Sequence, residues 1–124
     1  MIERLKKRRD FLAAQKGRKA VRRAFALESL KRDDEGAPRF GFTVSKRVSK
    51  SAVERNRIRR RLKEAVRLAS AQAAAPGHDY VLVGRRTALD EPFGKLSRDV
   101  ASALEQTSAV DADKKGALAQ NRAQ

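Results

Sequence analysis

The stretch that decides the fold is SAVERNRIRRRLKEAVRLASAQA, residues 51–73. Its apolar side chains recur at i, i+4, i+7, i+8 and i+11, namely Ile58, Leu62, Ala65, Val66 and Ala69. Such spacing gives a helix one apolar stripe, which must pack on the core of a domain. Ser51, with Glu54 three residues later, forms a capping box that begins the helix. The pair Pro76-Gly77 follows its end.

The polar face of this helix is strongly basic. From Lys46 to Arg67, ten basic residues stand against only two acidic ones. At 100° per residue, Asn56, Arg60, Lys63 and Arg67 point away from the apolar stripe, while Arg57, Arg59 and Arg61 flank it. A guanidinium group can bond phosphate oxygens in pairs. The ordinary alternative is a solvated charged face, but the scarcity of acidic residues favours a phosphate-binding surface.

The segments around this helix predict a small mixed sheet. The predicted elements are a helix at Glu3–Lys16, strands at Lys19–Leu30 and Arg39–Val48, the helix at 51–73, a strand at Tyr80–Val83 and a helix from Pro92 to about Gln106. The order α-β-β-α-β-α predicts an α/β (α+β) two-layer sandwich. Residues 1–106 form the predicted domain. Residues 107–124 lack periodicity and are predicted to be a disordered tail.

Composition narrows the class of protein. The 124 residues suffice for one domain, and 30 Lys and Arg against 15 Asp and Glu give a net charge of +15. Residues 1–67 hold 23 basic and 8 acidic side chains, so they carry the whole excess. A polyanionic partner is the simplest explanation. The chain has no cysteine and no apolar run that could span a bilayer, so we expect a cytoplasmic protein without a membrane partner.

Several segments, in the same order along the chain, resemble those of one protein family. The segment ERNRIRRRL, residues 54–62, resembles the arginine-asparagine-arginine signature of the ribonuclease P protein family. Upstream, Arg4-Leu5-Lys6 with Asp10-Phe11 is similar to that family's first helix, and GFTVSKR at 41–47 to its central strand. Downstream, HDYVLVGR at 78–85 is similar to the strand that ends in a functional arginine. The resemblance covers about residues 4–105.

The resemblance implies a fold, a function and a set of site residues. It implies a left-handed β-α-β crossover and a protein subunit bound to a catalytic RNA, which together remove the 5′ leader from precursor tRNA. The RNA would perform the chemistry with Mg²⁺ bound mainly by the RNA. The residues implied to bind the catalytic RNA are Arg55, Asn56, Arg57, Arg59, Arg60, Arg61 and Lys63. Those implied to line a cleft for the single-stranded leader are Phe11, Lys46, Arg47 and Arg85.

Phe11 has two interpretations. It lies between cations on the predicted first helix, an arrangement that stacks unpaired bases and neutralises phosphates. It could equally turn into the core, since an isolated Phe on a helix commonly packs there. The chain departs from the family at Gln15, where many members carry a second aromatic residue. It also lacks the glycine often found before the signature helix, and its segment 48–51 is one residue longer than in many relatives.

Three other functions remain open from the sequence. An autonomous nuclease would need a carboxylate cluster or a histidine base, but the chain offers His78 alone, predicted in a surface loop. A ribosomal protein or RNA chaperone would have the same composition, because phosphate neutralisation does not identify the nucleic acid. A duplex-DNA reader is the weakest alternative, since no helix-turn-helix partner or zipper accompanies the basic helix. We therefore predict no catalytic residue and no metal site in this chain.

Overall fold

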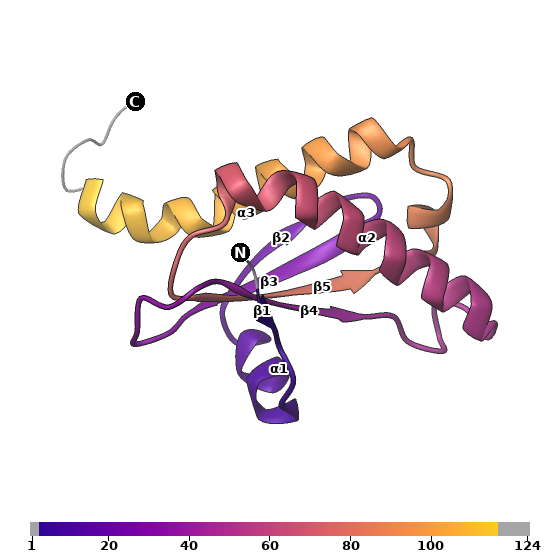
Figure 1. The fold of residues 1–124 in the computed structure, drawn as a ribbon, viewed down its shortest axis with the longest axis horizontal. Helices are drawn as coiled ribbons and strands as arrows, with labels where there is room; N and C mark the ends of the chain where they lie inside the picture. Colours follow the sequence, from indigo (N-terminus) through magenta and orange to yellow (C-terminus); the bar gives the residue numbers. More distant parts are fainter. Residues whose placement is uncertain (1–2, 117–124) are drawn as a thin grey trace.

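The computed structural model describes the backbone of residues 3–116, and the side chains of that range except 70–72 and 109–116. Five strands form one sheet in the order β1-β4-β5-β3-β2 (Figure 1). The strands are β1 (Glu3–Arg4), β2 (Arg18–Val21), β3 (Phe25–Lys31), β4 (Arg39–Thr43) and β5 (His78–Gly84). The helices are α1 (Arg8–Ala14), α2 (Ala52–Ala73), the 3-10 turn η1 (Arg86–Leu89) and α3 (Phe93–Gly116).

The sheet is mixed around its central strand, β5. Strand β3 runs antiparallel to both β5 and β2, whereas β4 runs parallel to β5 and β1 parallel to β4. Helix α2 therefore makes the crossover between two adjacent parallel strands, β4 and β5. The left-handed sense of this crossover, implied by the resemblance, stays a prediction.

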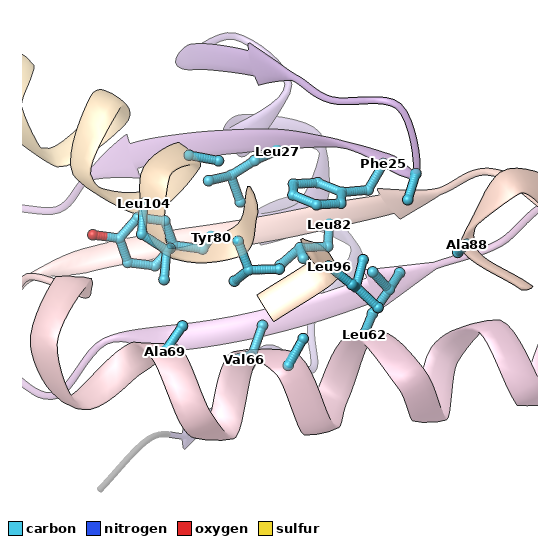
Figure 2. Packing of buried hydrophobic residues seen from close by; sticks show 14 of the residues in the cluster. Phe25, Leu27, Leu62, Val66, Ala69, Tyr80, Leu82, Ala88, Leu96 and Leu104 are labelled. Carbon is cyan, nitrogen blue, oxygen red and sulfur yellow. The ribbon is translucent and has the colours of Figure 1, made fainter. Parts of the chain in front are cut away.

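The main core lies between the sheet and helices α2 and α3, which cover one face (Figure 1). Figure 2 shows Leu62 and Val66 of α2 pointing toward the sheet, where Tyr80 and Leu82 of β5 meet them. A methyl group at Gly84 would lie 2.7 Å from Cγ2 of Ile58, so the glycine allows α2 to approach β5 closely. The apolar stripe of the basic helix thus packs as predicted.

The short helix α1 covers part of the opposite face (Figure 1). Leu5, Ala14 and Val81 are buried there in a second, smaller cluster, with Phe11 packed at its border. The sheet therefore has α2 and α3 on one face and α1 on the other. Among the described residues, no helix is long and apolar enough to cross a membrane.

The N-terminal elements differ from their predicted bounds. The predicted helix at Glu3–Lys16 begins only at Arg8, because the preceding residues pair with β4: the Leu5 N–H donates to the Phe40 carbonyl at 2.8 Å. The predicted strand at Lys19–Leu30 is two strands, since a tight turn in which the Arg22 N–H bonds to the Phe25 carbonyl reverses the chain. Propensity could not detect pairing with a distant strand.

Two further elements end elsewhere than predicted. The predicted strand at Arg39–Val48 ends at Thr43, and a turn closed by the Val48 N–H on the Ser45 carbonyl follows. Helix α3 continues past Gln106 to Gly116, so the predicted end of this helix was too early. Thr107 is buried and the Ser108 hydroxyl lies 2.5 Å from the Tyr80 hydroxyl of β5, which ties this part of the predicted tail to the domain. Residues 117–124 lie outside the described residues.

A buried ion cluster joins three strands at one end of the sheet. The carboxylate of Asp79, only 3% exposed, accepts hydrogen bonds from Arg32 at 2.8 Å and from Arg39 at 2.8 and 2.7 Å. Arg39 also lies 3.6 Å from the carboxylate of Asp10 in α1. The cluster therefore connects α1 to the sheet beside Phe11.

Candidate nucleic-acid interface

Phe11 borders two hollows. The larger has a volume of about 440 Å³ and is lined by Lys6, Arg8, Phe11, Leu12, Gln15 and Thr43. The smaller has a volume of about 170 Å³ and is lined by Arg4, Leu5, Phe11, Phe40, Gly41, Phe42, Arg59 and Lys63. Basic and aromatic side chains line both hollows, and among the described residues no acidic side chain does. This combination suits a chain that carries phosphates and flat bases.

Phe11 packs on the sheet and also borders both hollows; its stacking of bases stays a prediction. Its ring is half-buried and packs against Gly41 of β4, where a methyl group would lie 2.4 Å from Cε1 and 2.6 Å from Cζ. The same ring forms a wall of both hollows. Packing therefore fixes the ring in place while one part of it stays accessible.

The other three predicted cleft residues do not line either hollow. Lys46 and Arg47 follow the carboxyl end of β4, and Arg85 follows that of β5. All three are exposed. Since β4 and β5 are parallel neighbours, with Thr43 paired to Val83, their carboxyl ends lie at the same end of the sheet. The three cations therefore lie at that end, and Thr43, the last residue of β4, lines the larger hollow.

The basic residues of α2 have different surroundings. Arg57 and Arg60 are exposed on the helix surface. The Asn56 amide oxygen accepts a hydrogen bond from Arg59 at 2.8 Å, and this arginine, with Lys63, lines the smaller hollow. The Lys63 ammonium lies 6.0 Å from the centre of the Phe42 ring.

Two arginines of the signature contact the protein itself. Arg55 donates to the Ser49 carbonyl at 2.9 Å and fixes the loop before α2. Arg61 is half-buried, donates to the Glu91 carbonyl and lies 5.9 Å from the centre of the Phe93 ring. Its Nε is buried and has no hydrogen-bond partner among the described residues. The guanidinium of Arg61 thus joins α2 to the beginning of α3.

The capping box at the start of α2 forms only in part. The Glu54 N–H donates to the Ser51 hydroxyl at 3.2 Å, as predicted. The Glu54 carboxylate instead accepts from the Ser49 hydroxyl at 2.6 Å and from Arg86 at 3.0 Å, and it does not reach back to Ser51. These contacts, the Ser49 bond first and the neighbouring arginines after it, hold the pKa of Glu54 below its usual range.

His78 was wrongly predicted to lie in a surface loop. It is the first residue of β5, 4% exposed, and its ring stacks on Tyr80 at 5.7 Å between centroids. Its Nδ1 lies 2.9 Å from the Pro76 carbonyl oxygen. Among the described residues, no group of three or more His, Cys, Asp or Glu could hold a metal ion.

Sequence reasoning did not find the smaller hollow or the role of Gly41. The signal for Gly41 was its place in an alternating strand, where a glycine often marks close approach of another group. Nothing in the pattern could show that Arg4, from the N-terminal segment, would line the same hollow as Arg59 from α2.

Fold and site together define a small basic α+β protein with the kind of surface that nucleic-acid-binding proteins carry. The ribonuclease P family model matches residues 2–108. The chain therefore belongs to the ribonuclease P protein family, as its signature indicated.

Individual relatives agree with this family. The chain is 43% identical over 108 residues to the ribonuclease P protein component of Brucella suis, covering 81% of this chain and 76% of the relative. It is 41% identical over 122 residues to that of Caulobacter vibrioides, covering 98% and 80%. The solved ribonuclease P protein of Thermotoga maritima has a TM-score of 0.70 at 24% identity, covering 84% of this chain and 96% of that one. The likeness confirms the α+β fold class.

Proposed function

We propose that this chain is the protein subunit of a ribonuclease P ribonucleoprotein, in which it binds the catalytic RNA and the 5′ leader of precursor tRNA. Its family relates it to the tRNA-processing ribonuclease. In this proposal the protein strengthens substrate binding, and the RNA subunit catalyses cleavage in the cytoplasm. Phe11, Lys46, Arg47 and Arg85 hold the leader.

The observation that carries the proposal is the packed, partly accessible ring of Phe11 at the border of two hollows, which no acidic side chain of the described residues lines. An unpaired base can stack on such a ring, whereas a base within a duplex cannot reach it. A precursor differs from mature tRNA by its single-stranded leader. This surface would therefore favour the precursor over the product.

The exposed guanidinium groups of α2 support the second contact, with the catalytic RNA. Arg57 and Arg60 are exposed on the helix and form no ion pair among the described residues. Each can bind a phosphate oxygen pair without first breaking a bond within the protein. Binding of this kind weakens with salt, with a slope of log K against log salt of about −0.7 to −0.9 per phosphate contact.

The chemistry is proposed to belong to the RNA. The described residues offer no cluster of metal ligands, and the ring of the single histidine is buried against Tyr80. Mg²⁺ bound mainly by the RNA would activate the attacking water. The alternative of a ribosomal or other non-catalytic RNA-binding protein has no need for a surface that separates precursor from mature tRNA.

Cleavage of a 5′-extended precursor tRNA by a bacterial ribonuclease P RNA at low Mg²⁺, with and without this protein, tests the proposal. We expect the protein to restore release of the leader. Phe11→Ala and Lys46→Ala should weaken binding of precursor but not of mature tRNA. Arg98→Gln, at an exposed position of α3, is the charge-matched control. RNA binding without any change in cleavage would overturn the subunit assignment.

A further inference from the structure

We propose that the smaller hollow is a phosphate subsite for the leader strand, so that Arg59 and Lys63 of α2 contact the substrate and not the catalytic RNA. This inference rests on the proposed function and reassigns two residues of the signature helix. The ligand is the phosphodiester group of a single-stranded RNA that passes Phe11.

The hollow lies where the sheet edge opens beyond β1. Strand β1 has two residues, and its last bond to β4 among the described residues is from the Leu5 N–H to the Phe40 carbonyl. Orientation alternates along a strand, so the backbone of Phe42 points to the same side as that of Phe40. At Phe42 no residue of β1 is present to pair with it. The open edge thus presents backbone polar groups to the hollow.

Three cations from two elements converge on this edge. Arg4 comes from β1, and Arg59 and Lys63 stand four residues apart on one face of α2. Asn56 orients Arg59 through its 2.8 Å hydrogen bond, and Lys63 lies over the ring of Phe42. In the part of the chain that the structure describes, no carboxylate lines the hollow to neutralise them. Phe11, Phe40 and Phe42 line the same hollow and lower the local dielectric beside the cations, which strengthens their attraction for an anion.

The sizes of the two hollows suit different parts of a nucleotide, the base in the larger and the phosphate in the smaller. The larger, at about 440 Å³, falls within the range of roughly 300–1,000 Å³ typical of pockets for small organic ligands. The smaller, at about 170 Å³, falls below that range and suits a compact group. Phe11 borders both, so a base stacked on its ring would have a backbone phosphate close to the three cations.

Two other arginines of α2, Arg57 and Arg60, are exposed and provide the contrast. Arg57 and Arg60 line neither hollow. Around the helix axis Arg57 stands about 160° from Arg59 and about 120° from Lys63, and Arg60 stands about 100° from Arg59 and about 60° from Lys63. They are free to contact a second RNA surface. In this proposal Arg59 and Lys63 hold the leader, and Arg57 and Arg60, which line neither hollow, hold the catalytic RNA.

The test measures binding of precursor tRNAs with leaders of increasing length, and of mature tRNA, to the reconstituted holoenzyme. The variants are Arg59→Gln with Lys63→Gln, and Arg57→Gln with Arg60→Gln as the matched pair on the same helix. Affinity of each protein for the catalytic RNA alone is measured in parallel. We expect the first pair to lose about 10-fold in affinity for long-leader precursor, the contribution of one charged hydrogen bond. It should keep wild-type affinity for mature tRNA and for the catalytic RNA.

The outcomes separate this inference from the proposed function. If the first pair weakens binding to the catalytic RNA and affects precursor and mature tRNA equally, the subsite is overturned while the leader effect of the wild type stands. If the wild-type protein itself gives no leader-dependent gain, the proposed function fails. The affinity for long-leader precursor is also measured at several salt concentrations. The first pair of substitutions should reduce the slope of log K against log salt by about 0.7 for each leader phosphate that the variant no longer binds. An unchanged slope would also overturn the subsite.

Discussion

Replacing Gly41 by alanine should disable the cleft without removing any side chain that touches RNA. The added methyl group would lie 2.4 Å from Cε1 of Phe11 and 3.3 Å from Cβ of Leu5. Carbon atoms in ordinary contact are about 3.5–4.0 Å apart, so the ring must move by about 1 Å. The ring is the far end of a side chain on a short helix, so α1 and Phe11 yield more easily than the sheet.

Gly41→Ala should reduce both stability and substrate affinity. Overpacking of this size costs about 1–3 kcal/mol, and the lower chain entropy of alanine in the unfolded state returns about 0.4–1 kcal/mol. We therefore expect a net loss of about 1–2 kcal/mol in the free energy of unfolding, measured by urea denaturation. A base stacked on an aromatic ring contributes about 1–3 kcal/mol, so precursor affinity should fall by about 5- to 150-fold. Affinity for mature tRNA should not change.

A double-mutant cycle tests the mechanism directly. Phe11→Ala removes the ring, so adding Gly41→Ala to it should cost no further precursor affinity and little stability. Gly94→Ala is the matched control, because its methyl group would meet only the end of Arg98, at 3.6 Å. Phe11→Ala should lose the preference for precursor over mature tRNA. If Gly41→Ala keeps that preference at the wild-type level, Gly41 does not position the ring. Additive losses in the double variant would refute it equally.

Three further predictions follow from contacts within the protein. Arg61→Ala should lower the free energy of unfolding by about 1–3 kcal/mol, since it leaves the Glu91 carbonyl without its charged donor, whereas Arg60→Ala should change it by under about 0.5 kcal/mol in urea denaturation. Asp79→Ala should cost about 3–5 kcal/mol, because two arginines lose a buried carboxylate; a thermal unfolding shift no larger than that of a surface variant would contradict this. Hydrogen bonds from an arginine and a backbone N–H hold the pKa of Asp34 at about 2, below its ordinary 3.8. Its stabilising contribution should therefore be complete above pH 3.8 and be lost as the pH falls toward 2, so wild type and Asp34→Asn should converge in stability over that interval.

Elements with a strong internal pattern could be predicted from the sequence. The stripe of α2 packs on the sheet because Leu62, Val66 and their neighbours recur at the period of a helix, which needs no knowledge of the partner. The apolar run at Tyr80 is likewise the central strand. In both cases the local signal and the tertiary environment require the same structure.

The remaining elements depend on partners distant in the sequence. Glu3 and Arg4 are good helix formers, yet they pair with β4 because Leu5 is then buried against the sheet. His78 is enclosed because the strand it begins is central, which a lone histidine after Gly77 could not indicate. The candidate site follows the same rule: Phe11 was identified by type and neighbours, whereas the glycine that fixes it belongs to another element.

The signature helix shows most clearly why a sequence motif cannot assign roles residue by residue. Because successive residues are rotated by 100°, the cations of the helix point in different directions. Their contacts depend on the segments that lie in each direction, namely the loop before the helix, η1 and α3, and the open edge of β4. Arg55 and Arg61 donate to protein carbonyls, Arg59 and Lys63 line the smaller hollow, and Arg57 and Arg60 are exposed on the helix surface. Because each group lies in a different dielectric and has a different partner, the same loss of charge should reduce stability, leader binding or RNA docking according to its position. Averaging substitutions over the motif would therefore hide the physical cause of each effect.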